Sequence, residues 1–185
     1  MAGSTAMTTK LQKLIGRLLY YYPNKLINKL GHLYYGSQIQ GEVGTIHLKG
    51  RMSIQWPNRL IVGKNCCIND GCLMQCQSGV RLGDNVTIST GAIILARQYK
   101  MVDWLLQCQK DEPDKEHEEK AVFLNDHTWI GAGAIVLPGV QINGKGVVVA
   151  AGTIVTKSVN EDYVLVAGSP MRIVKHYKQQ IEVPE

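Results

Sequence analysis

From Leu124 onward the sequence repeats with a period of six residues. The segments LNDHTW, IGAGAI and VLPGVQ follow one another directly, and VAAGTI continues the pattern after a one-residue slip. An aliphatic residue takes the first place of each six and a small or β-branched residue the fifth. This period fits neither an amphipathic helix nor a long alternating strand. It fits short strands separated by tight corners, with three sixes to each turn of a parallel β-helix.

The same phase is present upstream, in the segments VGKNCC, INDGCL, LGDNVT and ISTGAI. The repeat therefore organises most of the chain and predicts an all-β, parallel β-helix domain over residues 36–169. Around it we expect a flexible head at 1–9, a helical cap at 10–35, and a short C-terminal helix and tail at 170–185.

The segment 10–35 has apolar residues at helical spacing, interrupted at Pro23, which predicts two short helices. Both carry basic residues, namely Lys10, Lys13, Arg17, Lys25 and Lys29. Such helices can cover the open first coil of a β-helix and protect its unpaired edge. They can equally lie on an anionic membrane surface. The sequence leaves both interpretations open.

From Arg97 to about Ala121 the six-residue pattern disappears and a polar stretch of mixed charge replaces it. Long loops inside compact repeats usually carry function. Because a solenoid surface is otherwise flat, we expect this loop to project and form one wall of a pocket.

Three sixes per turn place every third corner on the same edge of a three-sided prism. The first edge has corners at Asp84, Asp126 and Gly144, the second at Thr90, Ala132 and Ala151, and the third at Ala96, Pro138 and Lys157. The long loop leaves from the third edge. The second edge has almost no side chains, which suits an extended ligand whose amides pair with peptide groups. Tight corners also favour Gly and Ala for their own sake.

Composition narrows the class of protein. The net charge of +5 forms no basic, aromatic-rich stripe, so we expect no nucleic-acid partner. No apolar run reaches bilayer length and no signal peptide is recognisable, so we expect a cytoplasmic protein. Of the five cysteines, Cys66 and Cys72 take inward fifth places, which favours reduced core thiols over disulfides.

The segments WIGAGAIVLPGV, AAGTIVTK and VAGSPMRIVK resemble hexapeptide-repeat acetyltransferases of the maltose, galactoside and polysaccharide O-acetyltransferase type. The resemblance covers roughly residues 62–175. It implies a left-handed parallel β-helix, a homotrimer, and acetyl-coenzyme A (acetyl-CoA) bound in a cleft between neighbouring subunits.

Matching motif positions carries the donor site of that family onto this chain. The pantetheine arm would be lined by Trp129, Ala132, Ala151, Thr156 and Lys157. Arg172 and Lys175 would lie near the nucleotide phosphates, where cationic side chains suit a polyanion. Trp129 can equally be a packing residue, and Arg172 and Lys175 can belong to a solvated face of the C-terminal helix.

On the acceptor side the chain departs from the family. A His that acts as general base in galactoside-type members aligns with Tyr99, and a Tyr with a pKa of about 10 is a poor base at neutral pH. His117, in DKEHEEK, is the alternative base, since neighbouring carboxylates would raise its pKa and hold its ring. It can also be one more polar residue on a solvated arm. Asn69 matches a substrate-contacting Asn of the family, although Asn is common in turns.

These observations predict an acetyl-CoA-dependent acetyltransferase that acts on a sugar hydroxyl or amine, in surface polysaccharide or nucleotide-sugar biosynthesis. The alternative is a catalytically impaired, trimeric coenzyme A-binding or structural protein, because Tyr99 replaces the base. Hexapeptide-repeat carbonic anhydrases need three converging His. The five His of this chain do not have that spacing, so we expect no metal.

Overall fold

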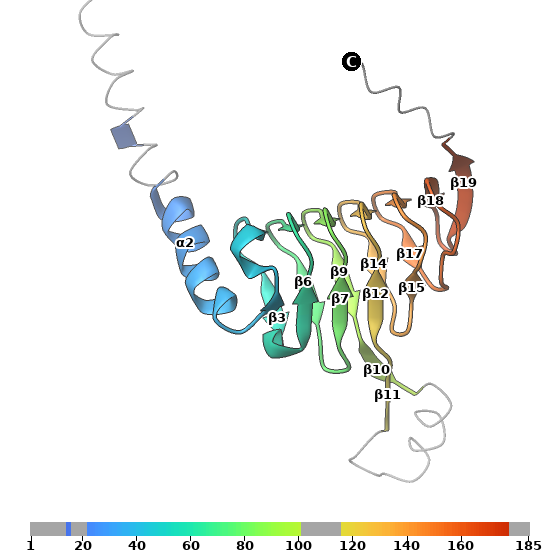
Figure 1. The fold of residues 1–185 in the computed structure, drawn as a ribbon, viewed down its shortest axis with the longest axis horizontal. Coiled ribbons are helices and arrows are strands. Elements are labelled where there is room, and N and C mark those ends of the chain that lie inside the picture. The colour runs from blue at the N-terminus through green and yellow to red at the C-terminus, as the bar shows by residue number, and fades with distance from the viewer. Residues whose placement is uncertain (1–13, 16–21, 101–115, 178–185) are drawn as a thin grey trace, which may run out of the picture.

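The protein is a left-handed parallel β-helix of about six turns, as the sequence predicts. The computed structural model describes residues 14–15, 22–100 and 116–177. Its strands stack along one axis, with the N-terminal helix α2 (Tyr22–Gly36) at one end and the last strands at the other (Figure 1). No helix among the described residues is long and apolar enough to cross a membrane.

Three sheets form the sides of the prism, and all their strands are parallel except β19 at the end of sheet B. Sheet A consists of β1 (Gln40–Gly41), β4 (Leu60–Val62), β7 (Val80–Leu82), β12 (Val122–Leu124) and β15 (Gln141–Ile142). Sheet B consists of β2 (His47–Leu48), β5 (Cys67–Ile68), β8 (Thr87–Ile88), β13 (Trp129–Ile130), β16 (Val148–Val149), β18 (Val164–Ala167) and β19 (Arg172–His176). Sheet C consists of β3 (Ser53–Gln55), β6 (Leu73–Gln75), β9 (Ile93–Leu95), β14 (Ile135–Val136) and β17 (Ile154–Val155).

Two further strands lie outside the prism, and two short helices turn the early coils. Strands β10 (Arg97–Tyr99) and β11 (His117–Glu119) form an antiparallel ribbon. The 3-10 helices are η2 (Val43–Thr45) and η3 (Pro57–Arg59).

The register confirms the counting of corners. In sheet A, Leu82 pairs with Leu124, which pairs with Ile142. Two residues beyond each of them lie the corners at positions 84, 126 and 144, which therefore form one edge. The pairs in sheets B and C place positions 90, 132 and 151 on the second edge and 96, 138 and 157 on the third.

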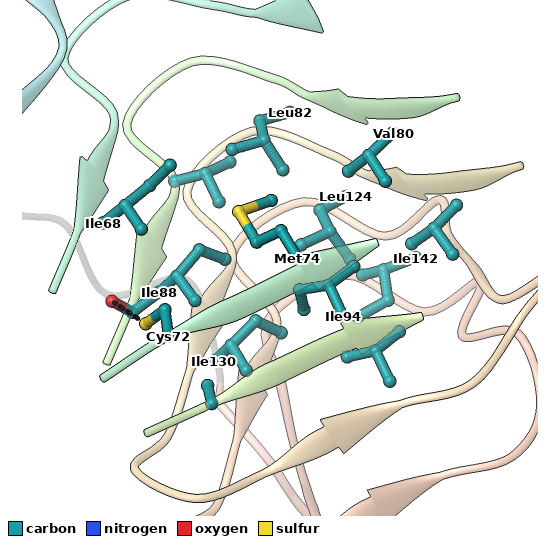
Figure 2. Packing of buried hydrophobic residues seen from close by; sticks show 14 of the residues in the cluster. Ile68, Cys72, Met74, Val80, Leu82, Ile88, Ile94, Leu124, Ile130 and Ile142 are labelled. Carbon is teal, nitrogen blue, oxygen red and sulfur yellow. Dashed lines mark hydrogen bonds between the residues drawn. The ribbon is translucent and has the colours of Figure 1, made fainter. Parts of the chain in front are cut away.

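The interior is filled by the aliphatic first-place residues, which stack in one column behind each sheet (Figure 2). Ile68, Ile88 and Ile130 follow one another behind sheet B and are fully buried. Each such side chain stabilises the fold by about 1.5–3 kcal/mol relative to an exposed one. The first place of each six-residue repeat thus corresponds to a buried core position.

Aspartates close the corners of the first edge. The Oδ1 atom of Asp84 accepts a hydrogen bond of 2.7 Å from the backbone N–H of Lys64, one coil earlier. Asp126 does the same for the N–H of Asp84 at 2.8 Å. Asp162 does so for Lys145 at 2.7 Å. Gly83 leaves room for this cap, since a Cβ there would lie 2.4 Å from Oδ1 of Asp126.

Helix α2 packs across the open side of the first coil. It begins at Tyr22, with Pro23 in the first turn, where the fixed φ of proline suits a helix start. Asn28 Oδ1 accepts from Gly50 N at 2.6 Å, and His32 Nε2 accepts from Leu48 N at 3.1 Å. These side chains satisfy backbone groups that no earlier coil can pair. Of the helix expected before Pro23, Leu14 and Ile15 are helical and the rest lies outside the described residues.

The predicted C-terminal helix is wrong over Arg172–His176. These residues form β19, which pairs antiparallel with β18. The reason is twofold: β18 ends the stack of sheet B and offers an open edge, and the β-branched pair Ile173 and Val174 favours a strand. Ile173 packs against the core, while its neighbours face outward.

Candidate functional site

The second edge exposes backbone donors. Among the described residues, no hydrogen-bond acceptor pairs with the N–H groups of Ala132 and Ala151. Both residues are exposed. Their neighbours Gly133 and Gly152 have φ values of +63° and +67°, and a Cβ at either would meet no atom within 4 Å. The second edge is therefore an open surface with free amide donors on adjacent coils.

A cationic side chain, Arg172, lies at the C-terminal end of the same edge. Ala167, at the end of β18, pairs with Arg172 of β19, so Arg172 lies one strand beyond the last coil. Neighbouring strands are about 4.8 Å apart, so three steps from Ala132 reach Arg172 over roughly 14 Å. Lys175 pairs with Leu165, in the same row of sheet B as Trp129, and its Nζ lies 4.7 Å from the ring centre of Tyr177.

Trp129 and Asn69 lie beside the second edge. Trp129 is on the outer surface with half of its area exposed, and its indole N–H donates to Ser89 Oγ at 2.8 Å. This bond fixes the indole across two coils, outside the core. Asn69 is half-buried, and its Nδ2 donates to the carbonyl of Ile88 at 2.8 Å. That bond ties one coil to the next, which is ordinary corner chemistry.

The two candidate catalytic residues meet at the third edge. Tyr99 of β10 and His117 of β11 are direct partners in the ribbon. Their ring centres are 4.3 Å apart, with the planes tilted by 35°. The ribbon projects from the prism at the third edge (Figure 1). An imidazole thus lies against the very side chain that aligns with the family base, a pairing that counting along the sequence does not reveal.

Charged side chains hold the two strands of the ribbon together. Glu116 pairs with Lys100 at 2.5 Å, and Arg97 with Glu119 at 3.6 Å. Glu118 contacts Lys120 and accepts a hydrogen bond from Gln98. The hydrogen bond from Lys120, followed by that from Gln98, lowers the pKa of Glu118. The sequence suggested that these carboxylates would surround the imidazole of His117. In the structure they pair with basic side chains along the ribbon.

Thr156 and Lys157 belong to the third edge as well. Both are exposed and follow β17, at the end of sheet C farther from Ala151. The structure therefore divides the predicted site residues into two groups. Asn69, Trp129, Ala132, Ala151 and Arg172 gather at the second edge, with Lys175 farther along sheet B. Tyr99, His117, Thr156 and Lys157 gather at the third.

The outer face of sheet C joins these two edges and is largely apolar from β6 to β17, with the polar residues Ser53, Gln55 and Gln75 toward its N-terminal end. One row across it contains Leu73, Ile93, Ile135 and Ile154. The next row adds Leu95 and Leu137. All six are partly exposed. A continuous aliphatic face of this kind marks a surface for association.

A shallow groove lies on a different side of the prism. It has a volume of about 880 Å³ and runs along the outer face of sheet A, over Ile61, Arg81 and Phe123. None of the predicted site residues lines it. Since the free donors, the cation and the stacked rings all lie elsewhere, we place the candidate site at the second and third edges.

Three of the cysteines are structural. Cys66, Cys72 and Cys76 are buried free thiols. Burial raises the pKa of all three, that of Cys76 to about 12, so they stay protonated at neutral pH. Within the described ranges, no three His, Cys, Asp or Glu side chains come together as metal ligands would.

Comparison with known proteins supports this description. The hexapeptide repeat of succinyl-transferase matches residues 59–96 and 125–157. These two segments of the chain therefore carry the hexapeptide repeat. A hexapeptide-repeat acetyltransferase from Vibrio cholerae superposes with a TM-score of 0.72 at 22% identity, over 92% of both chains. AntD, an N-acyltransferase from Bacillus cereus solved with dTDP and 3-hydroxybutyryl-CoA, gives 0.59 at 24% identity, over 76% of this chain and 84% of AntD.

Relatives of the chain by sequence are named as acetyltransferases. Galactoside O-acetyltransferase of Lactococcus lactis is 46% identical over 54 residues, which are 29% of this chain and 25% of that enzyme. The resemblance drawn from the motifs is confirmed. The chain spans between 22% and 55% of the length of the curated relatives that it matches.

Proposed function

We propose that the chain is an acetyl-CoA-dependent acetyltransferase that acts on a hydroxyl or amine of a sugar. The observation that carries the proposal is the division of the site residues between the second and third edges, with the apolar face of sheet C between them. Free amide donors and cations lie at one edge, and an imidazole lies at the other. Groups that suit a donor site and a group that suits a base thus lie on separate parts of one subunit.

A trimer brings these parts together. Packing the apolar face of sheet C around a threefold axis sets the second edge of one subunit beside the third edge of its neighbour. This buries the aliphatic rows and encloses a cleft between subunits. Light scattering at micromolar concentration is expected to return three times the chain mass. A monomer would contradict the shared cleft.

The donor would lie along the second edge. The N–H groups of Ala132 and Ala151 suit the amide carbonyls of the pantetheine arm, and Trp129 flanks it. Arg172 and Lys175 suit the nucleotide phosphates, as charge-assisted contacts. Thr156 and Lys157 would reach the arm from the neighbouring subunit. Asn69, beside Trp129, would face the acceptor.

The chemistry then follows from the geometry. A ring nitrogen of His117 accepts the proton of the acceptor hydroxyl or amine while that atom attacks the thioester carbonyl carbon. Backbone N–H groups of the cleft stabilise the oxyanion. The tetrahedral intermediate collapses, the carbon–sulfur bond breaks, and the sulfur takes the proton from His117, so that coenzyme A leaves as the free thiol. The acetyl group remains on the sugar.

The alternative is a trimer that binds coenzyme A without turnover. The presence of Tyr99 at the family's base position favours it. The contact between Tyr99 and His117 weighs against it, since an imidazole lies one ring away from that position. A cytoplasmic location, where acetyl-CoA is made and the free thiols stay reduced, is part of either proposal.

The rate of acetyl transfer tests the proposal, with a panel of free, nucleotide-linked and lipid-linked sugars and amino sugars. His117→Gln should lower turnover at least about a hundredfold while leaving coenzyme A affinity unchanged. Tyr99→His should keep or raise turnover, because it restores the family's base. A wild type that is inert on every acceptor, together with an active Tyr99→His variant, would establish the impaired protein instead.

A further inference from the structure

Helix α2 has its polar side against the protein and its apolar side toward solvent. Asn28, His32 and Tyr35 contact the first coil, where the Tyr35 hydroxyl donates to Met52 O at 3.2 Å. Two residues earlier along the helix, a second set with the same spacing consists of Leu26, Leu30 and Leu33. Two residues correspond to about 200° of helix rotation, so the two sets lie on opposite faces.

The apolar face is unusually open. Leu26, Leu30, Leu33 and Tyr34 are 57%, 52%, 74% and 62% exposed. A helix that caps a core normally does the reverse and buries its apolar stripe. The cap function therefore leaves this face unexplained.

The charge of the chain is concentrated in the same segment. Residues 1–41 contain Lys10, Lys13, Arg17, Lys25 and Lys29 and no Asp or Glu. Of the 20 basic residues these five leave 15, which the 15 acidic residues balance. The whole net charge of +5 thus belongs to the N-terminal segment. Lys25 and Lys29 flank the apolar face of α2 and are exposed.

We propose that the outer face of α2 binds the surface of an anionic membrane. An exposed apolar stripe flanked by lysines, in a segment of the sequence without Asp or Glu, has the chemistry of a helix that lies in the interface, its leucines among acyl chains and its cations at the headgroups. The helix lies at the end of the prism away from β19 (Figure 1), so this contact leaves the second and third edges accessible. Membrane binding by α2 does not depend on acetyl transfer. A failure to bind membranes would therefore leave the proposed activity intact.

Cosedimentation of the full chain with vesicles tests the inference. The chain should bind vesicles of phosphatidylglycerol and phosphatidylcholine at 1:3, at least tenfold more tightly than vesicles of phosphatidylcholine alone. Raising the salt should weaken that binding. Failure to bind the anionic vesicles would overturn the proposal.

Two variants separate the contributions, and both change exposed side chains, so the fold is expected to persist and can be checked by thermal unfolding. Leu26→Ser/Leu30→Ser/Leu33→Ser and Lys25→Gln/Lys29→Gln should each lower vesicle affinity at least tenfold. The matched control Lys64→Gln/Lys145→Gln removes the same charge elsewhere and should bind as wild type does. Equal binding by the leucine variant would overturn the proposal. So would a lower oligomeric state of that variant in solution, which would show that a second copy covers the face.

Discussion

The first and second edges have the same backbone geometry at their corners, but they differ in whether side chains cap the corner N–H groups. On both, the second corner residue is left-handed, with φ of +57° at Asn85 and His127 and +68° and +63° at Gly91 and Gly133. On the first edge, Asp84 and Asp126 cap the corner N–H of the preceding coil. On the second edge Asp70 accepts from Arg51 N in the first coil, but the corner N–H groups of Ala132 and Ala151 have no such cap. A corner therefore folds without its cap, which leaves the second edge free to serve a ligand.

The largest effect is expected from breaking a first-edge corner. Gly83→Ala places a Cβ 2.4 Å from Asp126 Oδ1 and 2.7 Å from Asp126 N, so the coils must separate. We expect a loss of about 3 kcal/mol or more in the free energy of unfolding, as for other overpacked or uncapped sites. Gly91→Ala lies at a different place, the left-handed residue of a second-edge corner, where no atom lies within 4 Å and only the positive φ opposes a side chain. It should lose about 1 kcal/mol. Urea unfolding measures both, and equal losses would contradict the close approach of the coils at Gly83.

Removing a cap should cost less than forcing the coils apart. Asp126→Ala leaves the N–H of Asp84 without its partner, and we expect a loss of about 1–2 kcal/mol in the same measurement. Thr90→Ala at the second edge should change stability by no more than about 0.5 kcal/mol. A similar loss for Thr90→Ala would mean that the second edge is also structural.

The cations at the end of the second edge should affect the ligand and leave the fold unchanged. Arg172→Ala/Lys175→Ala should weaken coenzyme A binding at least tenfold, or about 1.4 kcal/mol. It should also flatten the dependence of binding on salt, because screening acts on these charges. Calorimetric titration at two salt concentrations measures both. An unchanged isotherm would assign both residues to the surface alone.

The buried residues behind the two edges should contribute equally to stability, so the smallest difference between the edges is expected there. Cys66 Sγ lies 3.1 Å from Gly83 O and Cys72 Sγ lies 3.1 Å from Ser89 O. Cys66→Ala and Cys72→Ala should therefore lose similar stability, within about 0.5 kcal/mol of each other.

The same pair of variants gives a pH dependence. Burial raises the pKa of both thiols above 9.0, so their contribution is fully present below pH 9 and falls as the unfolded chain ionises above it. The deficit of both variants relative to wild type should shrink between pH 8 and pH 10. A deficit that grows for either one would contradict the burial of that thiol.

Most of the fold could be predicted because each core residue recurs at a fixed place in the repeat. The first-place aliphatic residues determine the register and hence the three edges. Two features could not be obtained that way. The strand at Arg172–His176 depends on the open edge of β18, which lies outside the repeat. The contact between Tyr99 and His117 depends on a ribbon that closes a long non-repeating segment, so no spacing along the chain indicates it.

Coenzyme A affinity of second-edge variants tests the central claim, that this edge is the donor surface, most directly. Ala132→Leu and Ala151→Leu each add a side chain to an exposed corner, so they should leave the free energy of unfolding unchanged. Each should weaken coenzyme A binding at least tenfold by blocking the free N–H groups. Lys64→Leu places the same side chain on a corner of the first edge and should bind as wild type does. Equal affinities in all three variants would contradict the claim.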